Sequence, residues 1–98
     1  MEIKVNMNLE EFVQRIKEAD EDLIIFQKGK SDMNADIALF KGEEGENGVV
    51  TVGGEKYYYF LEVFIAREFI EDWVNSLDHR PTSREIAVRL WEYAVTDA

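Results

Sequence analysis

The apolar pattern of this chain changes from strand-like to helical within one stretch that contains neither glycine nor proline. A strand is expected to carry the tyrosines at positions 57–59. From Ala66 onward, apolar residues recur at helical spacing and charged residues occupy the opposite face. Extending that helix backwards would place Glu62 on its apolar face. The sequence therefore predicts that a strand runs directly into a helix somewhere between Phe60 and Phe64.

Two further helices are predicted from capping residues and apolar spacing. Asn8 is suited to be an N-cap, and apolar residues at helical spacing follow it over residues 9–19. Near the C-terminus, Thr82 and Glu85 have the spacing of a capping box. The helix that they open is expected to run to about Val95.

Short strands are predicted between the first and second helices. Gly53-Gly54 is a two-residue hairpin signal, because glycine readily adopts the positive φ angles of such turns. The segment 42–48 combines three glycines with three glutamates and predicts a loop. The expected strands are residues 23–26, 35–40 and 49–52, with a fourth beginning near Glu55. The first of them is a short, wholly apolar run, which predicts a strand buried on both faces. Short connections favour an antiparallel meander, so we predict a single α+β domain over residues 1–98, in the order helix, three or four strands, helix, helix.

The composition excludes several kinds of chemistry. The 98 residues are enough for one domain, and they include no cysteine and one histidine, His79. Disulfides, thiolate metal sites and a two-histidine metal site within one chain are therefore excluded. No Gly-x-Ser-x-Gly segment is present, and His79 is suited to a helix end, where a cation offsets the helix dipole. We expect no enzymatic activity and no cofactor.

One segment has nearly the spacing of a calcium-binding loop. Asp32, Asn34, Asp36 and Glu43 occupy places where such a loop has oxygen ligands. Ile37, however, stands where the sharp turn needs glycine, and the flanking residues predict strands rather than helices. We therefore expect a turn followed by a strand, and no bound metal.

Acidic residues outnumber basic residues by 21 to 11, which gives a formal net charge of -10. This charge disfavours direct binding to nucleic acid and favours a basic protein surface as the partner, for example that of a nucleic-acid-binding protein or nuclease. A simpler interpretation, in which the acidity only keeps the protein soluble, stays open. No secretory signal pattern opens the chain, and no apolar stretch is long enough to span a bilayer. A cytoplasmic protein without a membrane partner is expected.

The acidic residues gather in three clusters, and each placement brings like charges together or puts them where they are unfavourable. One cluster follows the last turn of the first helix, where the helix dipole disfavours anions. A second occupies one face of the helix that begins near Ala66, where Arg67 offsets only part of the repulsion. The third lies in the glycine-rich loop. We interpret these clusters as the candidate partner-binding residues: Asp20, Glu21, Asp22, Glu43, Glu44, Glu46, Glu68, Glu71 and Asp72.

Three consecutive tyrosines cannot all face one side of a strand, because successive side chains alternate. At least one is expected to face outward unless a second layer covers that face too. We add Tyr58 to the candidate partner-binding residues, because exposed tyrosines are favoured at interfaces. The last helix has a wide apolar arc that includes Trp91. Such an arc fits deep burial or a homodimer contact.

The layout and charge of the chain resemble the small acidic anti-CRISPR proteins of phages, which inhibit the RNA-guided nuclease of type II CRISPR systems. The likeness lies in the opening helix at 8–19, the strands around 23–26, 35–40 and 49–52, and the helix at 66–77. It implies a protein that occupies a basic DNA-binding groove, with carboxylates in place of phosphates. We therefore expect a non-enzymatic protein-binding module, an inhibitor from a mobile element. The alternative is a homo-oligomeric structural or accessory protein.

Overall fold

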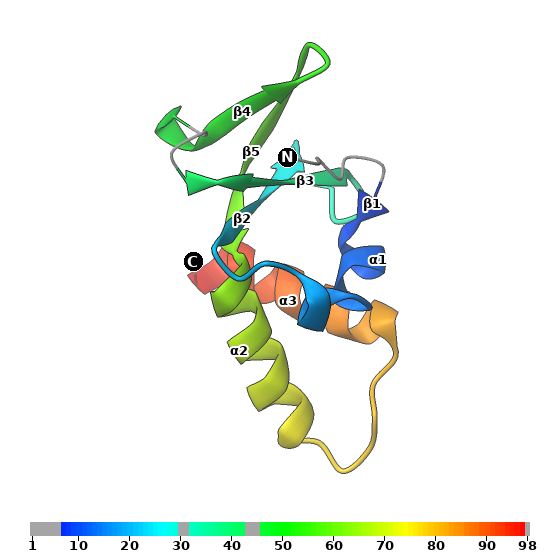
Figure 1. Ribbon diagram of the computed structural model, residues 1–98. Coiled ribbons are helices and arrows are strands. Elements are labelled where there is room, and N and C mark those ends of the chain that lie inside the picture. Colours follow the sequence, from blue (N-terminus) through cyan, green and yellow to red (C-terminus); the bar gives the residue numbers. More distant parts are fainter. Residues whose placement is uncertain (1–6, 30–31, 43–45, 98) are drawn as a thin grey trace.

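The computed structural model describes residues 7–29, 32–42 and 46–97, in which helices cover one face of a five-stranded antiparallel sheet (Figure 1). The helices are α1 (Leu9–Val13), α2 (Val63–Asn75) and α3 (Ser83–Asp97), together with the short 3₁₀ helices η1 (Ile16–Glu18) and η3 (Glu46–Gly48). The strands are β1 (Met7–Asn8), β2 (Leu23–Lys28), β3 (Asp36–Lys41), β4 (Val49–Val52) and β5 (Glu55–Glu62). The predicted α+β class is confirmed.

The predicted meander is wrong, because the strands do not follow one another across the sheet. Their spatial order is β1-β3-β2-β5-β4, so β2 pairs with both β3 and β5. The chain thus forms two hairpins, β2–β3 and β4–β5, which join along β2 and β5. The central place of β2 has a physical reason: Ile25 and Phe26 point to opposite faces and are both fully buried. The short strand β1 adds to the sheet by pairing with β3.

The first helix is also shorter than predicted. Its start is confirmed, because Asn8 caps α1 and forms a capping box with Glu11. The α-helix ends at Val13, however, and Arg15 leaves the helical conformation before η1 begins. Ile16 is still buried in the core. The apolar spacing therefore identified the buried face correctly but not the break within it.

The junction between strand and helix lies where the apolar pattern changes. β5 ends at Glu62 and α2 begins at Val63, inside the predicted window. A bulge in β5 sets the register here, since Ile25 lies opposite Leu61 and Phe26 lies opposite Tyr59. Phe60 is the extra residue, and it joins Leu61 in the core on the helical side.

The predicted hairpin turn and the predicted capping box are both confirmed. Gly53 and Gly54 connect β4 to β5 with φ angles of 57° and 83°. At the start of α3, the backbone amide of Thr82 donates to Glu85 Oε1 at 2.8 Å, and the amide of Glu85 donates to Thr82 Oγ1 at 3.1 Å. The bond from the Thr82 amide, with a smaller contribution from the Thr82 side chain, lowers the pKa of the Glu85 carboxyl below its ordinary value of 4.5.

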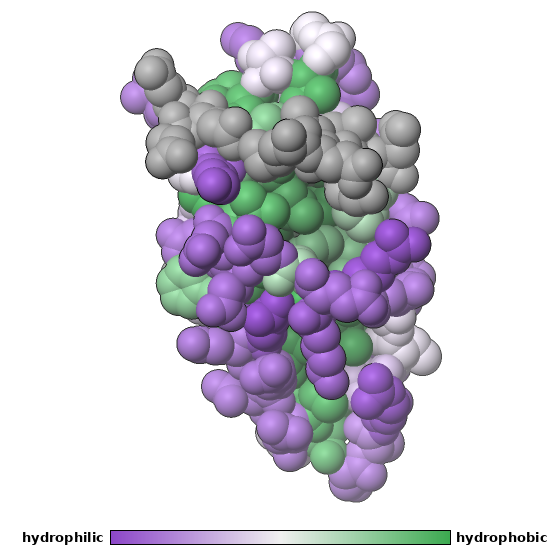
Figure 2. Space-filling model, in the orientation of Figure 1, coloured by the Kyte–Doolittle hydropathy of each residue, from purple (hydrophilic) through white to green (hydrophobic). Residues whose placement is uncertain are grey.

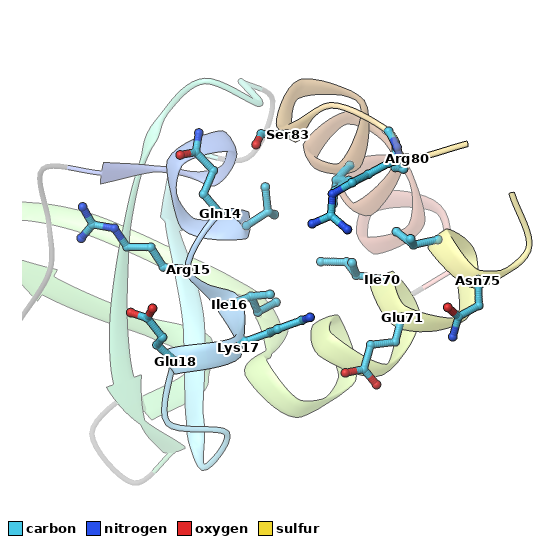
Figure 3. Close-up of a pocket in the computed structure, with 14 residues that line it drawn as sticks. Gln14, Arg15, Ile16, Lys17, Glu18, Ile70, Glu71, Asn75, Arg80 and Ser83 are labelled. Atoms are coloured by element: carbon cyan, nitrogen blue, oxygen red, sulfur yellow. The ribbon is translucent and has the colours of Figure 1, made fainter. Parts of the chain in front are cut away.

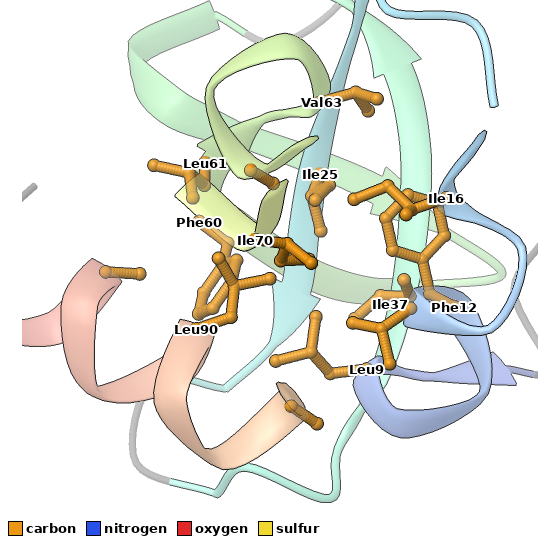
Figure 4. Packing of buried hydrophobic residues seen from close by; sticks show 14 of the residues in the cluster. Leu9, Phe12, Ile16, Ile25, Ile37, Phe60, Leu61, Val63, Ile70 and Leu90 are labelled. Atoms are coloured by element: carbon orange, nitrogen blue, oxygen red, sulfur yellow. The ribbon is translucent and has the colours of Figure 1, made fainter. Parts of the chain in front are cut away.

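The sheet separates two apolar clusters. The larger one lies between the sheet and the helices, where Phe12, Leu61 and Leu90 converge from α1, β5 and α3 (Figure 4). The smaller one lies on the other face and contains Phe26, whose ring meets that of Phe40 edge-on at 6.2 Å. The helical layer and the sheet are thus held by one continuous core, and the polar residues of the helices face outward.

Candidate functional site: an acidic surface

Arg67 brings together two of the predicted acidic clusters. Its guanidinium Nη1 donates to Glu21 Oε2 at 2.9 Å, and Nη2 donates to the carbonyl oxygens of Ile16 and Ala19 at 2.9 and 2.7 Å. Arg67 lies in the first turns of α2, whereas its three acceptors lie in η1 and in the loop before β2. The cluster at residues 20–22 is therefore fixed beside the acidic face of α2.

We call these two joined clusters the acidic surface; it consists of Asp20, Glu21, Asp22, Glu68, Glu71 and Asp72. All six side chains are exposed. Glu21 forms an ion pair with Arg67, and none of the other five forms one with any side chain in the described ranges. Hydrophilic side chains spread over the helical half of the molecule in Figure 2, in the region of α2. The acidic surface therefore carries unneutralised negative charge.

The two clusters are held by features that the sequence shows only in part. The amide of Asp22 donates to Asp20 Oδ1 at 2.9 Å, which forms a tight turn between η1 and β2. On α2, Glu68 and Asp72 lie four residues apart, and Glu71 lies between them on the same side of the helix. Sequence analysis treated Arg67 only as a partial counter-charge on its own helix. It is the residue that positions the loop, and its distance in sequence from Glu21 explains why no local pattern revealed it.

The third predicted cluster lies largely outside the described residues. Glu43 and Glu44 lie outside the described residues, as does the side chain of Glu46. Glu46 itself is the first residue of η3, directly before β4. These three residues stay a prediction.

The three tyrosines of β5 differ in exposure. Tyr57 is buried, with 4% of its surface exposed, Tyr58 is half-buried, and Tyr59 is 43% exposed. The expectation that at least one faces outward is confirmed, and the most exposed ring is that of Tyr59, the neighbour of the predicted Tyr58. Tyr59 meets Phe26 edge-on at 6.4 Å on the sheet face away from the helices. Burial raises the pKa of the Tyr59 hydroxyl above its ordinary value, and Glu62 contributes to the shift.

The predicted calcium-loop residues form a turn and the start of a strand. Asp32 Oδ1 accepts from the amide of Asn34 at 2.9 Å, and Asp36 is the first residue of β3. Glu43 lies outside the described residues. Within the described ranges, no three histidine, aspartate or glutamate side chains are grouped closely enough to hold a metal ion.

A cleft that sequence analysis missed borders the acidic surface. It has a volume of about 560 Å³ and lies between the α1–η1 segment, α2 and the chain leading into α3 (Figure 3). Glu71 belongs to both features, as it lines the cleft and carries part of the acidic surface. The lining residues come from three separated segments of the chain, so no single motif could have indicated the cleft.

Comparisons of the chain with protein-family models, curated proteins and solved structures find no match. The acidic surface and the cleft must therefore be interpreted from their own chemistry. In the described part of the chain, no helix combines the length and the apolar character needed to cross a membrane.

Proposed function

We propose that the protein is a non-enzymatic acidic module that docks on a basic surface of another protein. The observation that carries this proposal is the joining of two carboxylate clusters through Arg67, with five of the six carboxylates left without an ion pair among the described residues. Opposite fields raise the association rate of two proteins and orient them before contact. A basic surface would supply the counter-charges that this chain does not place beside these carboxylates.

The partner proposed here is a nucleic-acid-binding protein, and the role is that of an inhibitor from a mobile element. Support comes from the chain's net charge of -10, which opposes direct contact with nucleic acid, and from the resemblance in layout to the anti-CRISPR proteins. Carboxylates spaced along a rigid surface can occupy a groove that otherwise binds phosphates. A DNA-cleavage assay with a type II RNA-guided nuclease tests this role. Loss of cleavage on addition of the chain supports it, and unchanged cleavage at saturating protein contradicts it.

The general docking proposal has its own test, which does not need the natural partner. The intact, isotope-labelled protein is titrated with a nona-arginine peptide at low and at high salt, and the amide signals are followed by NMR. We expect the signals of residues 20–22 and 68–72 to move first, and the affinity to fall as salt rises. Uniform shifts over the whole surface would contradict a defined docking site.

A matched pair of variants separates a defined surface from overall charge. Glu68→Gln/Asp72→Asn removes two charges from the acidic surface, and Asp78→Asn/Glu92→Gln removes two exposed charges elsewhere. We expect the first variant to bind the peptide roughly three- to tenfold more weakly, because each exposed ion pair contributes about 0.2–1 kcal/mol. The second variant should lose clearly less of its affinity for the peptide. Equal losses would show that net charge alone explains the binding.

One observation favours homo-oligomerisation as a second candidate function. The exposed apolar side chains Tyr59 and Val95, at 43% and 48% exposure, line one hollow together with Tyr58, between β5 and the end of α3. Light scattering across a range of concentrations tests this candidate. A dimer that dissociates in Val95→Asp supports it, and a monomer at all concentrations rules it out.

A further inference from the structure

The cleft beside α2 contains two cations that point toward one another from opposite walls. Lys17 extends from η1, and Arg80 extends from the chain before α3, so that both charged ends enter the same space (Figure 3). Neither side chain forms a hydrogen bond or an ion pair with any other residue in the described ranges. Two like charges that converge without a counter-ion repel one another, and an anion between them would remove that repulsion.

The other charged groups of the cleft do not supply that anion. Glu18 and Glu71 line the cleft; in Figure 3 the Glu18 carboxylate points away from it, and the Glu71 carboxylate lies on the side of Lys17 opposite Arg80, outside the space between the two cations. Arg15 also lines the cleft, and its guanidinium points away as well. The space between the two walls is therefore positive, although the molecule as a whole is negative.

Some other cations among the described residues do form ion pairs with carboxylates. Lys28 pairs with Glu55, Arg67 with Glu21, and Arg84 with Glu10. In a chain with nearly twice as many acidic as basic residues, an unpaired cation has many carboxylates available to it. Arg15, Lys17 and Arg80 all line this one cleft without an ion pair among the described residues, and the acidic surface does not explain that grouping.

The floor of the cleft is apolar. Ile16 and Ile70 line the same space as the two cations and are 5% and 8% exposed. Further apolar lining comes from Val13, Val74, Pro81 and Ile86. A ligand that fits both parts needs an anionic head for the cations and an apolar body for the floor.

We infer that this cleft binds a small amphipathic carboxylate, with its head between Lys17 and Arg80 and its apolar body against Ile16 and Ile70. A carboxylate can accept from both cations at once through its two oxygens, and such charge-assisted bonds are stronger than neutral ones. The volume of about 560 Å³ lies within the usual range of small-molecule sites, roughly 300–1,000 Å³. This inference does not depend on the proposed docking function, because it concerns a different surface and a ligand of opposite charge.

Octanoate is a suitable probe for this cleft. The intact protein is labelled at its isoleucine and valine methyl groups and titrated with octanoate while NMR spectra are recorded. We expect saturable shifts at Ile16, Ile70, Val74 and Ile86, and only small shifts in the sheet. Octanol carries the same apolar body without charge, and acetate carries the charge without the body. Both should bind roughly tenfold more weakly or worse.

A pair of variants tests the role of the two cations. Lys17→Gln/Arg80→Gln should weaken octanoate binding roughly tenfold or more, because it removes both charge-assisted contacts. Lys56→Gln/Arg89→Gln removes the same number of positive charges from residues that do not line the cleft, and its binding should change less than about twofold. All four replaced side chains are exposed, so both variants should fold, and circular dichroism checks this.

Three results would overturn the inference. These are unmoved cleft signals on addition of octanoate, octanol binding as tight as octanoate binding, and an equal loss of affinity in the two variants. The peptide titration described above is independent of these measurements. Failure of octanoate binding therefore leaves the docking proposal standing, and failure of the docking proposal leaves the cleft inference standing.

Discussion

Replacing Arg67 with methionine should destabilise the fold much more than replacing an ordinary surface arginine. Methionine keeps most of the apolar stem, so the change removes the guanidinium and its hydrogen bonds while leaving the packing nearly intact. Two of these bonds go to the backbone carbonyls of Ile16 and Ala19, and the side chain is only 21% exposed. The perturbation therefore acts at the contact between η1 and α2.

The expected magnitude follows from the contacts. Hydrogen bonds from a charged group contribute about 1.5–3 kcal/mol each, and the lower end applies because the site is partly exposed. The variant also removes the buried Nε atom of Arg67, which has no hydrogen-bond partner in the described structure. Burying this unsatisfied group costs about 1 kcal/mol or more of folding free energy, and the variant regains that amount. The net loss in the free energy of unfolding should be about 2 kcal/mol, which corresponds to a decrease in Tm of roughly 8–16 °C for a domain of this size.

Urea unfolding followed by tryptophan fluorescence measures this loss. The matched control is Arg84→Met, since Arg84 bonds to Glu10 and Asn34 at distances of 3.3 and 2.9 Å but is 53% exposed. We expect the control to lose less than about 1 kcal/mol. If Arg67→Met loses less than about 0.5 kcal/mol, or no more than the control, the proposed role of Arg67 is refuted.

Three further predictions concern the turn, the last helix and the core. Gly54→Ala should lower the free energy of unfolding by about 1–2 kcal/mol, because alanine is strained at a φ of 83°. Gly53→Asn, at a φ of 57°, should change the free energy of unfolding by less than about 0.5 kcal/mol. Equal effects of the two substitutions in urea unfolding would contradict this prediction. The pKa of Glu85 is lower in the folded state, so its contribution to stability is present above its ordinary pKa of 4.5 and is lost as the pH falls through the folded value. Glu85→Gln should therefore flatten the acid side of the stability profile, and an unchanged profile would show that the capping bond has no effect. Leu90→Ala, at a fully buried position, should lower the free energy of unfolding by about 2–5 kcal/mol. Val95→Ala, at a position that is 48% exposed, should lower it by less than about 0.5 kcal/mol. Similar losses of stability in calorimetry would contradict the assignment of the core.

Features set by neighbouring residues could be predicted from the sequence. The cap at Asn8, the capping box that begins at Thr82 and the hairpin at Gly53-Gly54 each depend on residues within four positions of one another. The change from strand to helix after Glu62 could be located for a similar reason, because the apolar face changes its period there. Local chemistry was sufficient for these features.

Strand order could not be derived in the same way, because it depends on contacts between distant segments. The apolar run at 23–26 predicted a strand buried on both faces, which is typical of a central position. The short connections nevertheless favoured a meander, in which that strand would lie at the edge. The structure shows that burial was the better guide, since β2 lies between β3 and β5. The preference for short connections is statistical, whereas the burial of Ile25 and Phe26 on both faces requires cover from neighbours on both sides.

The candidate site was predictable in its charges but not in its assembly. The acidic residues of the loop and of α2 were visible as separate clusters, whereas their proximity depends on Arg67. The cleft gave no sequence signal, because Lys17 and Arg80 are ordinary exposed cations until the fold places them opposite one another.

Arg67 connects the two surfaces to which we assign functions. Its bonds to the carbonyls of Ile16 and Ala19 hold the two ends of η1 against α2. Lys17 lies between those two residues, so the same bonds fix the wall from which Lys17 enters the cleft. Its bond to Glu21 fixes the loop that carries the first acidic cluster. One largely buried guanidinium thus positions a positive cleft and a negative surface side by side, and this explains how a chain with so few cations can present both.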